Sequence, residues 1–182
     1  GINVSENTKH KAVLLYDTEQ SEVQLFKNVT NLIKRAKQTD KPDEFKAFCL
    51  TGMSRKERLH AIVQSMDRYY FQYGGIQLVV IDGIADLVRC ANDEAESVAI
   101  IDELYRLAGI YKTCIICVLH FIPNGLKLRG HLGSELQRKA AAILSIEKDE
   151  DPALSVVKAL KVRDGSPLDV PLMLFSWDKA AG

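Results

Sequence analysis

Several features are absent from this sequence, and each absence excludes a class of protein. No apolar run approaches the roughly 20 residues of a membrane span, and no signal peptide opens the chain. There is no net charge, because 24 Lys and Arg residues balance 24 Asp and Glu residues. Any contact with nucleic acid would therefore come from a local basic patch. We expect a soluble, cytoplasmic protein of one domain over residues 1–182, with residues 1–10 frayed or extraneous to it.

Cysteine is also scarce, with four residues in the chain. Cys114 and Cys117 form a C-x-x-C pair, but they lie in an apolar stretch with the composition of a buried strand. Positions three apart on a strand point to opposite faces, so this pair is poorly placed for a disulfide or a shared zinc ion. We interpret the cysteines as small core residues.

The strongest local pattern is the stretch 77–83, Gln-Leu-Val-Val-Ile-Asp-Gly. A continuous apolar run without alternation is typical of a strand that is covered on both faces of a parallel sheet. Asp82, at the carboxyl end of this strand, lies where open α/β sheets bind their ligands. Capping of the following turn would explain the same residue equally well.

Apolar periodicity and capping signals predict alternating strands and helices. The predicted strands are 11–16, 45–50, 76–82 and 113–119, and the predicted helices are 21–37, 54–73 and 92–109. This order predicts an α/β fold with a parallel sheet and right-handed crossovers. Further strands at 140–147, 154–162 and 170–175 are separated by close turns, so we expect antiparallel strands that extend the parallel sheet.

Polar side chains follow three of the predicted parallel strands. Glu19 lies three residues past the first strand, Asp82 ends the third, and His120 follows the fourth. Because the carboxyl ends of parallel strands share one edge of the sheet, we expect these groups to converge on one site. Each of them alone is also explained as a turn cap or a hydrogen-bonded packing residue.

A phosphate-binding loop is the part that such a site still needs. The motif G-x-x-x-x-G-K-S/T, whose backbone N–H groups and Lys meet the phosphates of a nucleotide, does not occur in the chain. The stretches 52–55 and 130–134 contain glycine but have neither the spacing nor the Lys-Ser/Thr end. We therefore expect no tightly bound nucleotide.

In their order, these motifs resemble the RecA/DnaB-type P-loop ATPases, most closely the RepA-like plasmid helicases and KaiC-like proteins. The stretch 13–19, Val-Leu-Leu-Tyr-Asp-Thr-Glu, is similar to the family strand that ends in the Glu which activates water. The stretch 78–86 is similar to the Walker B strand and the loop after it. The resemblance runs from Ala12 to Phe175 and starts after the P-loop helix, so we expect a fragment without the Walker A loop that is inactive alone.

The resemblance implies a RecA-like three-layer core in a DNA helicase or recombinase-type motor from replication, a plasmid or a mobile element. Such a motor hydrolyses ATP with Mg²⁺ at the subunit interfaces of a homo-oligomeric ring or filament. Glu19 would then act as the base, Asp82 would hold Mg²⁺ through water, and His120 would sense the γ-phosphate.

The resemblance also gives roles to basic residues late in the chain. The hairpin 160–165, Leu-Lys-Val-Arg-Asp-Gly, is similar to the Lys-x-Arg hairpin that reaches the γ-phosphate of the neighbouring subunit. Lys161 and Arg163 are two positions apart on a strand, so they share a face as this role requires. The loop 121–133 would contact single-stranded DNA through Lys127, Arg129 and His131.

Other interpretations stay open. The chain could be a degenerate RecA-like module that serves as a scaffold or binds a partner, with its carboxylates kept only as caps. Lys161 and Arg163 could be charged residues that protect an edge strand from aggregation. A flavodoxin-like or receiver domain is less favoured, because the terminal hairpins do not suit it.

Overall fold

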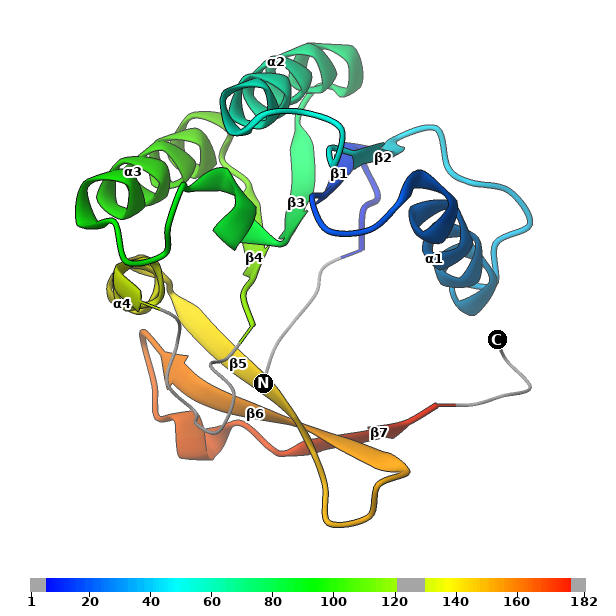
Figure 1. Ribbon diagram of the computed structural model, residues 1–182. Helices are drawn as coiled ribbons and strands as arrows, with labels where there is room; N and C mark the ends of the chain where they lie inside the picture. The colour runs from blue at the N-terminus through cyan, green and yellow to red at the C-terminus, as the bar shows by residue number, and fades with distance from the viewer. Residues whose placement is uncertain (1–5, 121–129, 178–182) are drawn as a thin grey trace. The chain divides into compact units, whose positions relative to one another are not determined.

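The structure is a computed structural model that describes residues 6–120 and 130–177 (Figure 1). The chain divides into two compact units: Asn7–Leu136, and a smaller unit that contains the described residues from Gln137 onward. The elements in chain order are β1 (Ala12–Asp17), α1 (Glu22–Arg35), β2 (Phe45–Cys49), α2 (Arg55–Tyr73), β3 (Ile76–Asp82), the 3-10 helix η1 (Ile84–Leu87), α3 (Glu94–Tyr111), β4 (Cys114–Val118), α4 (Gly130–Lys139), β5 (Ala142–Lys148), β6 (Leu154–Val162), the 3-10 helix η2 (Pro167–Asp169) and β7 (Met173–Ser176).

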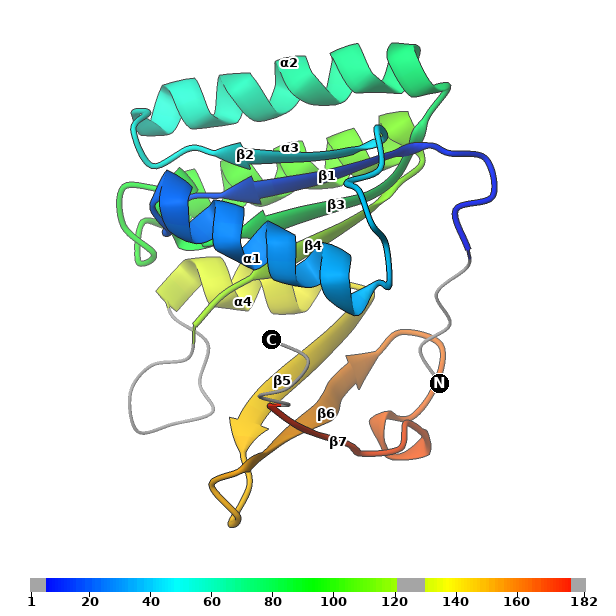
Figure 2. The same ribbon diagram turned by 90° about the vertical axis from the view of Figure 1, so that its right-hand side faces the viewer.

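Four strands of the larger unit form a parallel sheet in the order β2-β1-β3-β4. The chain starts at β1, adds β2 on one side, and then crosses over to add β3 and β4 on the other. Accordingly, α1 covers one face of the sheet while α2 and α3 cover the other (Figure 1 and Figure 2). The predicted α/β fold with a parallel sheet is confirmed. The direction of winding reverses between β1 and β3, and open α/β sheets bind ligands at such a switch point.

The hydrophobic core of the larger unit joins one face of the sheet to α2 and α3. It includes Leu14, Tyr16, Val79, Ile81, Ile62, Met66, Ile101, Leu104 and Leu107. On the opposite face of β3, Leu78 and Val80 are only partly buried. This strand is therefore more deeply buried on the face of Val79 and Ile81 than on the other, instead of being covered equally on both as predicted, because α1 is the single described helix over that second face (Figure 2).

Local signals place the helix ends well. The side chain of Glu57 accepts a hydrogen bond from the Ser54 backbone N–H at 2.8 Å, as expected of a capping box at the start of α2. Gly74 ends α2 with a φ of +66°, a left-handed conformation that glycine adopts without strain. The helix α3 runs to Tyr111, two residues past the predicted end at Gly109.

The smaller unit holds an antiparallel sheet in the order β5-β6-β7. The three strands lie close to their predicted positions. They form a sheet of their own in the described chain and do not extend the parallel sheet, so this part of the prediction is corrected. Each strand pairs with its predecessor across the connections 149–153 and 163–172, and that pairing already satisfies the backbone groups along the shared edges.

All four cysteines are free. Cys90 and Cys114 are exposed, so the prediction that every cysteine is a core residue is wrong for these two. Burial raises the pKa of the Cys117 thiol to about 12, which makes this residue a poor nucleophile at neutral pH.

None of the helices in the described ranges combines the length and the apolar composition that crossing a membrane requires.

Candidate functional site

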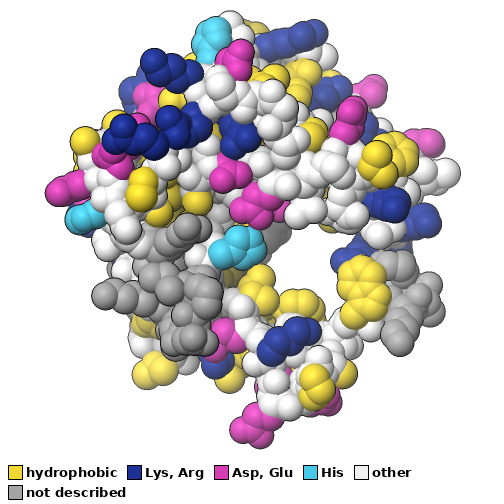
Figure 3. Space-filling model, viewed as in Figure 1, with side chains coloured by type: hydrophobic (Ala, Val, Ile, Leu, Met, Phe, Trp, Pro, Cys, Tyr) yellow, Lys and Arg dark blue, Asp and Glu magenta, His cyan; other side chains and the backbone are white. Residues whose placement is uncertain are grey.

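Three acidic side chains and a histidine follow the carboxyl ends of the parallel strands. Asp17 and Asp82 end the adjacent strands β1 and β3 and are register partners. Glu19 lies two residues past β1, and His120 lies two residues past β4. Figure 3 views the molecule from the side at which these strands end, and acidic side chains lie next to a histidine on that face.

The structure brings Glu19 and His120 into contact. Glu19 Oε2 lies 3.2 Å from His120 Nε2, although the two residues are 101 positions apart in the sequence. The histidine side chain is 76% exposed and the glutamate side chain 30% exposed, so both are open to solvent. The pair can therefore exchange its mutual contact for contacts with a ligand at little desolvation cost.

Asp82 differs from Asp17 and Glu19 in the balance of burial and charge around its carboxyl. Burial raises the pKa of its carboxyl, and the charges of Asp17 and then Glu19 raise it further, while His120 lowers it. No hydrogen bond from a described residue reaches the Asp82 carboxylate. A cation bound here would offset the free-energy cost of burying the Asp82 charge and would weaken its repulsion from Asp17 and Glu19.

Asp17 was not identified from the sequence. Its side chain is buried, and its Oδ1 accepts hydrogen bonds from the backbone N–H groups of Glu19 at 2.9 Å and Gln20 at 2.8 Å. These bonds fix the turn that carries Glu19. One signal was present, because Asp17 follows an apolar strand just as Asp82 does.

Thr18 joins the turn after β1 to the turn after β3. Its hydroxyl lies within hydrogen-bond distance of two carbonyl oxygens and can donate to either: Oγ1 is 3.0 Å from the oxygen of Asp82 and 2.8 Å from that of Gly83. Gly83 has a φ of +86°, and a Cβ on it would lie 2.3 Å from Thr18 Oγ1 and 2.6 Å from Glu19 Cγ. Only glycine permits this close approach, which sets the spacing of Glu19 and Asp82.

The loop after β3 is held by a largely buried arginine that sequence reasoning also missed. Arg58 of α2 donates to the carbonyls of Leu50 at 3.0 Å, Thr51 at 3.3 Å and Asp86 at 3.2 Å. Its guanidinium also lies 3.6 Å from the Asp86 carboxylate. The loops that follow β2 and β3 are thus tied together behind the acidic edge.

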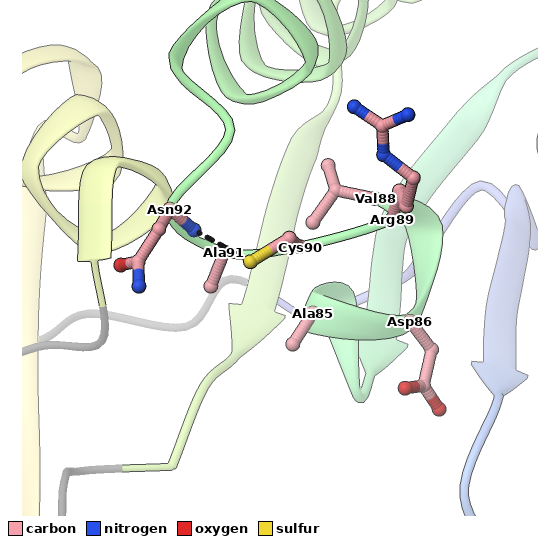
Figure 4. A pocket seen from close by; sticks show the side chains of 7 residues that line it. All are labelled: Ala85, Asp86, Val88, Arg89, Cys90, Ala91 and Asn92. Carbon is pink, nitrogen blue, oxygen red and sulfur yellow. Dashed lines mark hydrogen bonds between the residues drawn. The ribbon is translucent and has the colours of Figure 1, made fainter.

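A cavity of about 250 Å³ opens along this loop (Figure 4). Its lining consists of Ala85, Asp86, Val88, Arg89, Cys90, Ala91 and Asn92. The side chains of Asp86 and Arg89 leave the loop in opposite directions, and the Asn92 N–H lies 3.4 Å from Cys90 Sγ. The predicted residues Glu19, Asp82 and His120 are not part of this lining.

Direct metal ligation by a preformed cluster finds no support in the part of the chain that the structure describes. No group of three or more His, Cys, Asp or Glu side chains there is arranged to hold a metal ion. A single carboxylate that acts through water, as predicted for Asp82, does not need such a cluster, because Mg²⁺ usually keeps several waters.

The basic residues of the predicted finger have partners within the smaller unit. Lys161 Nζ donates to the carbonyl of Gln137 at 2.5 Å and lies 3.3 Å from that of Arg138, and Arg163 Nη2 donates to the carbonyl of Lys139 at 3.0 Å. These carbonyls end α4, where cations are favoured by the helix dipole.

The residues predicted to contact DNA lie mostly outside the described chain. Lys127 and Arg129 are among the residues that the structure does not describe. His131 lies in the first turn of α4 and is exposed.

Comparison with protein-family models gives no match, and comparison with curated proteins gives none either.

Proposed function

We propose that this chain is the larger part of a RecA-like ATPase motor domain, with a three-layer core, in a cytoplasmic DNA helicase or recombinase-type protein. The observation that carries the proposal is the meeting of Glu19 and His120 beside Asp82 at the switch point of a parallel sheet. Phosphoryl transfer from ATP needs a carboxylate on the metal side, a group that positions water, and polar contacts to the γ-phosphate.

The chemistry of Asp82 fits a magnesium ion. Its carboxylate accepts no hydrogen bond from the described residues, and its raised pKa reflects burial and like charges that a cation would offset. Mg²⁺ supplies charge neutralisation for the phosphates when it is bound. Glu19 would then orient the attacking water and take its proton, while His120 keeps the Glu19 carboxylate in place and faces the γ-phosphate.

Two further parts of the mechanism come from outside this site. The proposal requires a loop that binds the phosphates, and the motif of such a loop does not occur in these 182 residues. Lys161 and Arg163 would act on the nucleotide of the adjacent subunit in a ring or filament. Their present bonds to α4 are exposed and are worth about 0.5–1.5 kcal/mol each, whereas charge-assisted bonds to phosphate are roughly twice as strong.

Contact with single-stranded DNA is assigned to the loop 121–133 through Lys127, Arg129 and His131. This loop follows β4, so in the proposed motor it links the nucleic acid to the strand that precedes His120. Binding there would be mostly to phosphates and would weaken with salt.

A scaffold is the second candidate. The bonds of Lys161 and Arg163 to the end of α4 already give both residues a structural role, and the chain contains no phosphate loop. In a partner-binding module that does not bind nucleotide, stabilising the end of α4 would be a sufficient role for Lys161 and Arg163.

The decisive experiment measures ATP hydrolysis by the full-length protein with and without single-stranded DNA. Glu19→Gln should lower DNA-stimulated turnover by at least about 100-fold and leave nucleotide binding intact, because only the group that positions water is lost. Glu22→Gln, on an exposed residue in the first turn of α1, is the matched control and should retain activity. Absence of nucleotide binding in the unaltered protein would favour the scaffold.

Mixed oligomers test the action across subunits. Protomers with Arg163→Ala and protomers with Glu19→Gln should each be inactive alone and should regain part of the activity when mixed, since some interfaces then pair an intact base with an intact finger. No recovery on mixing, or a coding sequence without G-x-x-x-x-G-K-S/T ahead of residue 1, would contradict the proposal.

A further inference from the structure

The helix α2 passes over the edge strand β2 (Figure 2). A row of aromatic rings with two cations belongs to these two elements. We call this set the α2–β2 surface; it consists of Lys46, Phe48, Arg68, Tyr69 and Tyr73. Tyr73 is the last residue of α2 and Lys46 is the second of β2, so the surface reaches toward the amino ends of the strands. The proposed ATPase chemistry, at the carboxyl ends, does not use it.

The rings form a continuous row from the core outward. Ring centroids are 5.2 Å apart between Tyr16 and Phe48, 6.0 Å between Phe48 and Tyr69, and 6.1 Å between Tyr69 and Tyr73. Tyr16 is fully buried, whereas Tyr69 and Tyr73 are partly exposed. The Tyr73 hydroxyl donates to the carbonyl of Asp43 at 2.7 Å, which fixes the outer end of the row. The outer ring of the row is therefore anchored to the residues that precede β2.

Two cations lie over these rings. Lys46 Nζ is 5.7 Å from the ring centroid of Tyr69 and 5.5 Å from that of Tyr73, and Arg68 Cζ is 5.6 Å from that of Tyr69. These distances are within the range of cation–π attraction. The ring contacts thus reduce the number of positions that each long side chain can take.

Neither cation forms an ion pair in the described chain, although the charge of Lys46 acts on Glu44 and helps to lower the pKa of that carboxyl. No carboxylate there lies within 4.0 Å of Lys46 or Arg68. The nearby Glu44 instead pairs with His10 Nδ1 at 2.8 Å. The surface thus offers two positioned positive charges beside partly exposed aromatic faces, in a chain that has no net charge overall.

We propose that the α2–β2 surface binds single-stranded nucleic acid. Proteins hold such strands without sequence preference by pairing cations with phosphates and stacking bases on aromatic side chains, and both groups occur together here. An acidic peptide would use Lys46 and Arg68 but would have no base to place on the ring row. None of the five residues belongs to the stretch 121–133, and the inference does not depend on ATP hydrolysis.

The test uses a fluorescein-labelled oligo-dT of about 20 nucleotides and fluorescence anisotropy of the 182-residue chain across a salt series. The variant Lys46→Gln/Arg68→Gln removes both cations, and Lys27→Gln/Lys34→Gln removes two exposed charges from α1 as the matched control. The first should weaken binding by at least about fivefold and reduce the slope of log K against log salt by roughly 1.4, which corresponds to two lost phosphate contacts. The control should stay within about twofold of the unaltered chain.

Other outcomes would overturn the inference. If both double variants lost the same amount of affinity for the oligonucleotide, binding would depend on the total positive charge of the chain and not on the α2–β2 surface. Unchanged binding after Lys46→Gln/Arg68→Gln would place the strand elsewhere. Displacement of the oligonucleotide by an oligo-glutamate of equal charge would assign the surface to an acidic protein partner. Thermal melts of each variant check that the fold is intact.

Discussion

The Asp82 carboxylate provides the sharpest test of how the acidic edge is built. If Asp82 were a turn cap, its replacement would cost stability, because a lost cap typically costs about 1 kcal/mol. Its carboxylate accepts no hydrogen bond from the described residues, and burial together with Asp17 and Glu19 raises its pKa. We therefore expect the isosteric change Asp82→Asn to stabilise the folded chain at neutral pH.

The size of the gain follows from the sheet geometry. Asp17 and Asp82 are register partners on neighbouring strands, so their Cα atoms are about 5 Å apart, and we use this spacing as the scale for the repulsion between their carboxylates. Two like charges at that distance repel by roughly 1–3 kcal/mol at effective dielectric constants between 80 and 20. Solvent at this open edge favours the lower end of that range. We expect a net gain of about 0.5–2 kcal/mol in the free energy of unfolding, the usual size for relief of a functional-site strain.

Urea unfolding followed by circular dichroism measures this gain. Asp40→Asn removes the same charge from an exposed position before β2 and should change the free energy of unfolding by less than about 0.5 kcal/mol. Thermal melts should agree, with about 2–4 °C in Tm for each kcal/mol in a chain of this length.

The pH dependence gives a second test of the same reasoning. The pKa of Asp82 is raised in the folded state, so the unaltered chain gains stability as the pH falls through that raised value. The gain is complete below the ordinary carboxyl pKa of about 4. The advantage of Asp82→Asn should thus be largest near neutral pH and shrink in acid. A variant that is less stable at neutral pH, or an advantage that grows in acid, would refute this account.

Three further substitutions test the frame around the site, each followed by urea unfolding. Gly83→Ala should cost about 2–4 kcal/mol, because it combines a φ of +86° with a Cβ 2.3 Å from Thr18 Oγ1. Leu14→Ala should cost about 2–5 kcal/mol through the cavity left in the fully buried core, and a loss below 1 kcal/mol would contradict that burial. Tyr16→Phe should cost about 0.5–1.5 kcal/mol by removing the 2.7 Å hydrogen bond to Ser65 Oγ, and adding Ser65→Ala should cost little more if the two losses share that bond.

The order of strands and helices in the larger unit could be predicted because its signals are local. Apolar runs, the capping box at Ser54 and the glycine at position 74 each lie within a few residues of the boundary that they set. The convergence of Glu19 and His120 could also be predicted from the sequence, because parallel strands end at the same edge of a sheet whatever their order.

Other features depend on tertiary pairing and could not be predicted. Whether β5, β6 and β7 join the parallel sheet depends on which edge is available in the folded chain, and local turns do not encode that. The proximity of Asp17 to Asp82 depends on the register of β1 against β3. Likewise, the bonds of Lys161 to the end of α4 join positions 24 and 23 residues apart, and no periodicity indicates them.

The distribution of hydrogen bonds at the acidic edge bears on the choice between motor and scaffold. The Asp17 carboxylate accepts hydrogen bonds from two backbone N–H groups, as expected of a carboxylate that stabilises the turn after a strand. Asp82 and Glu19 do not follow this pattern: Asp82 accepts nothing from the described chain, and the Glu19 carboxylate meets a solvent-exposed histidine. Meanwhile Thr18 and Gly83 lock the two turns at a spacing that a side chain at position 83 would break. Asp82 thus carries a carboxylate without a hydrogen bond from the described residues, next to the Glu19–His120 pair, and in the proposed motor a bound cation would offset its charge.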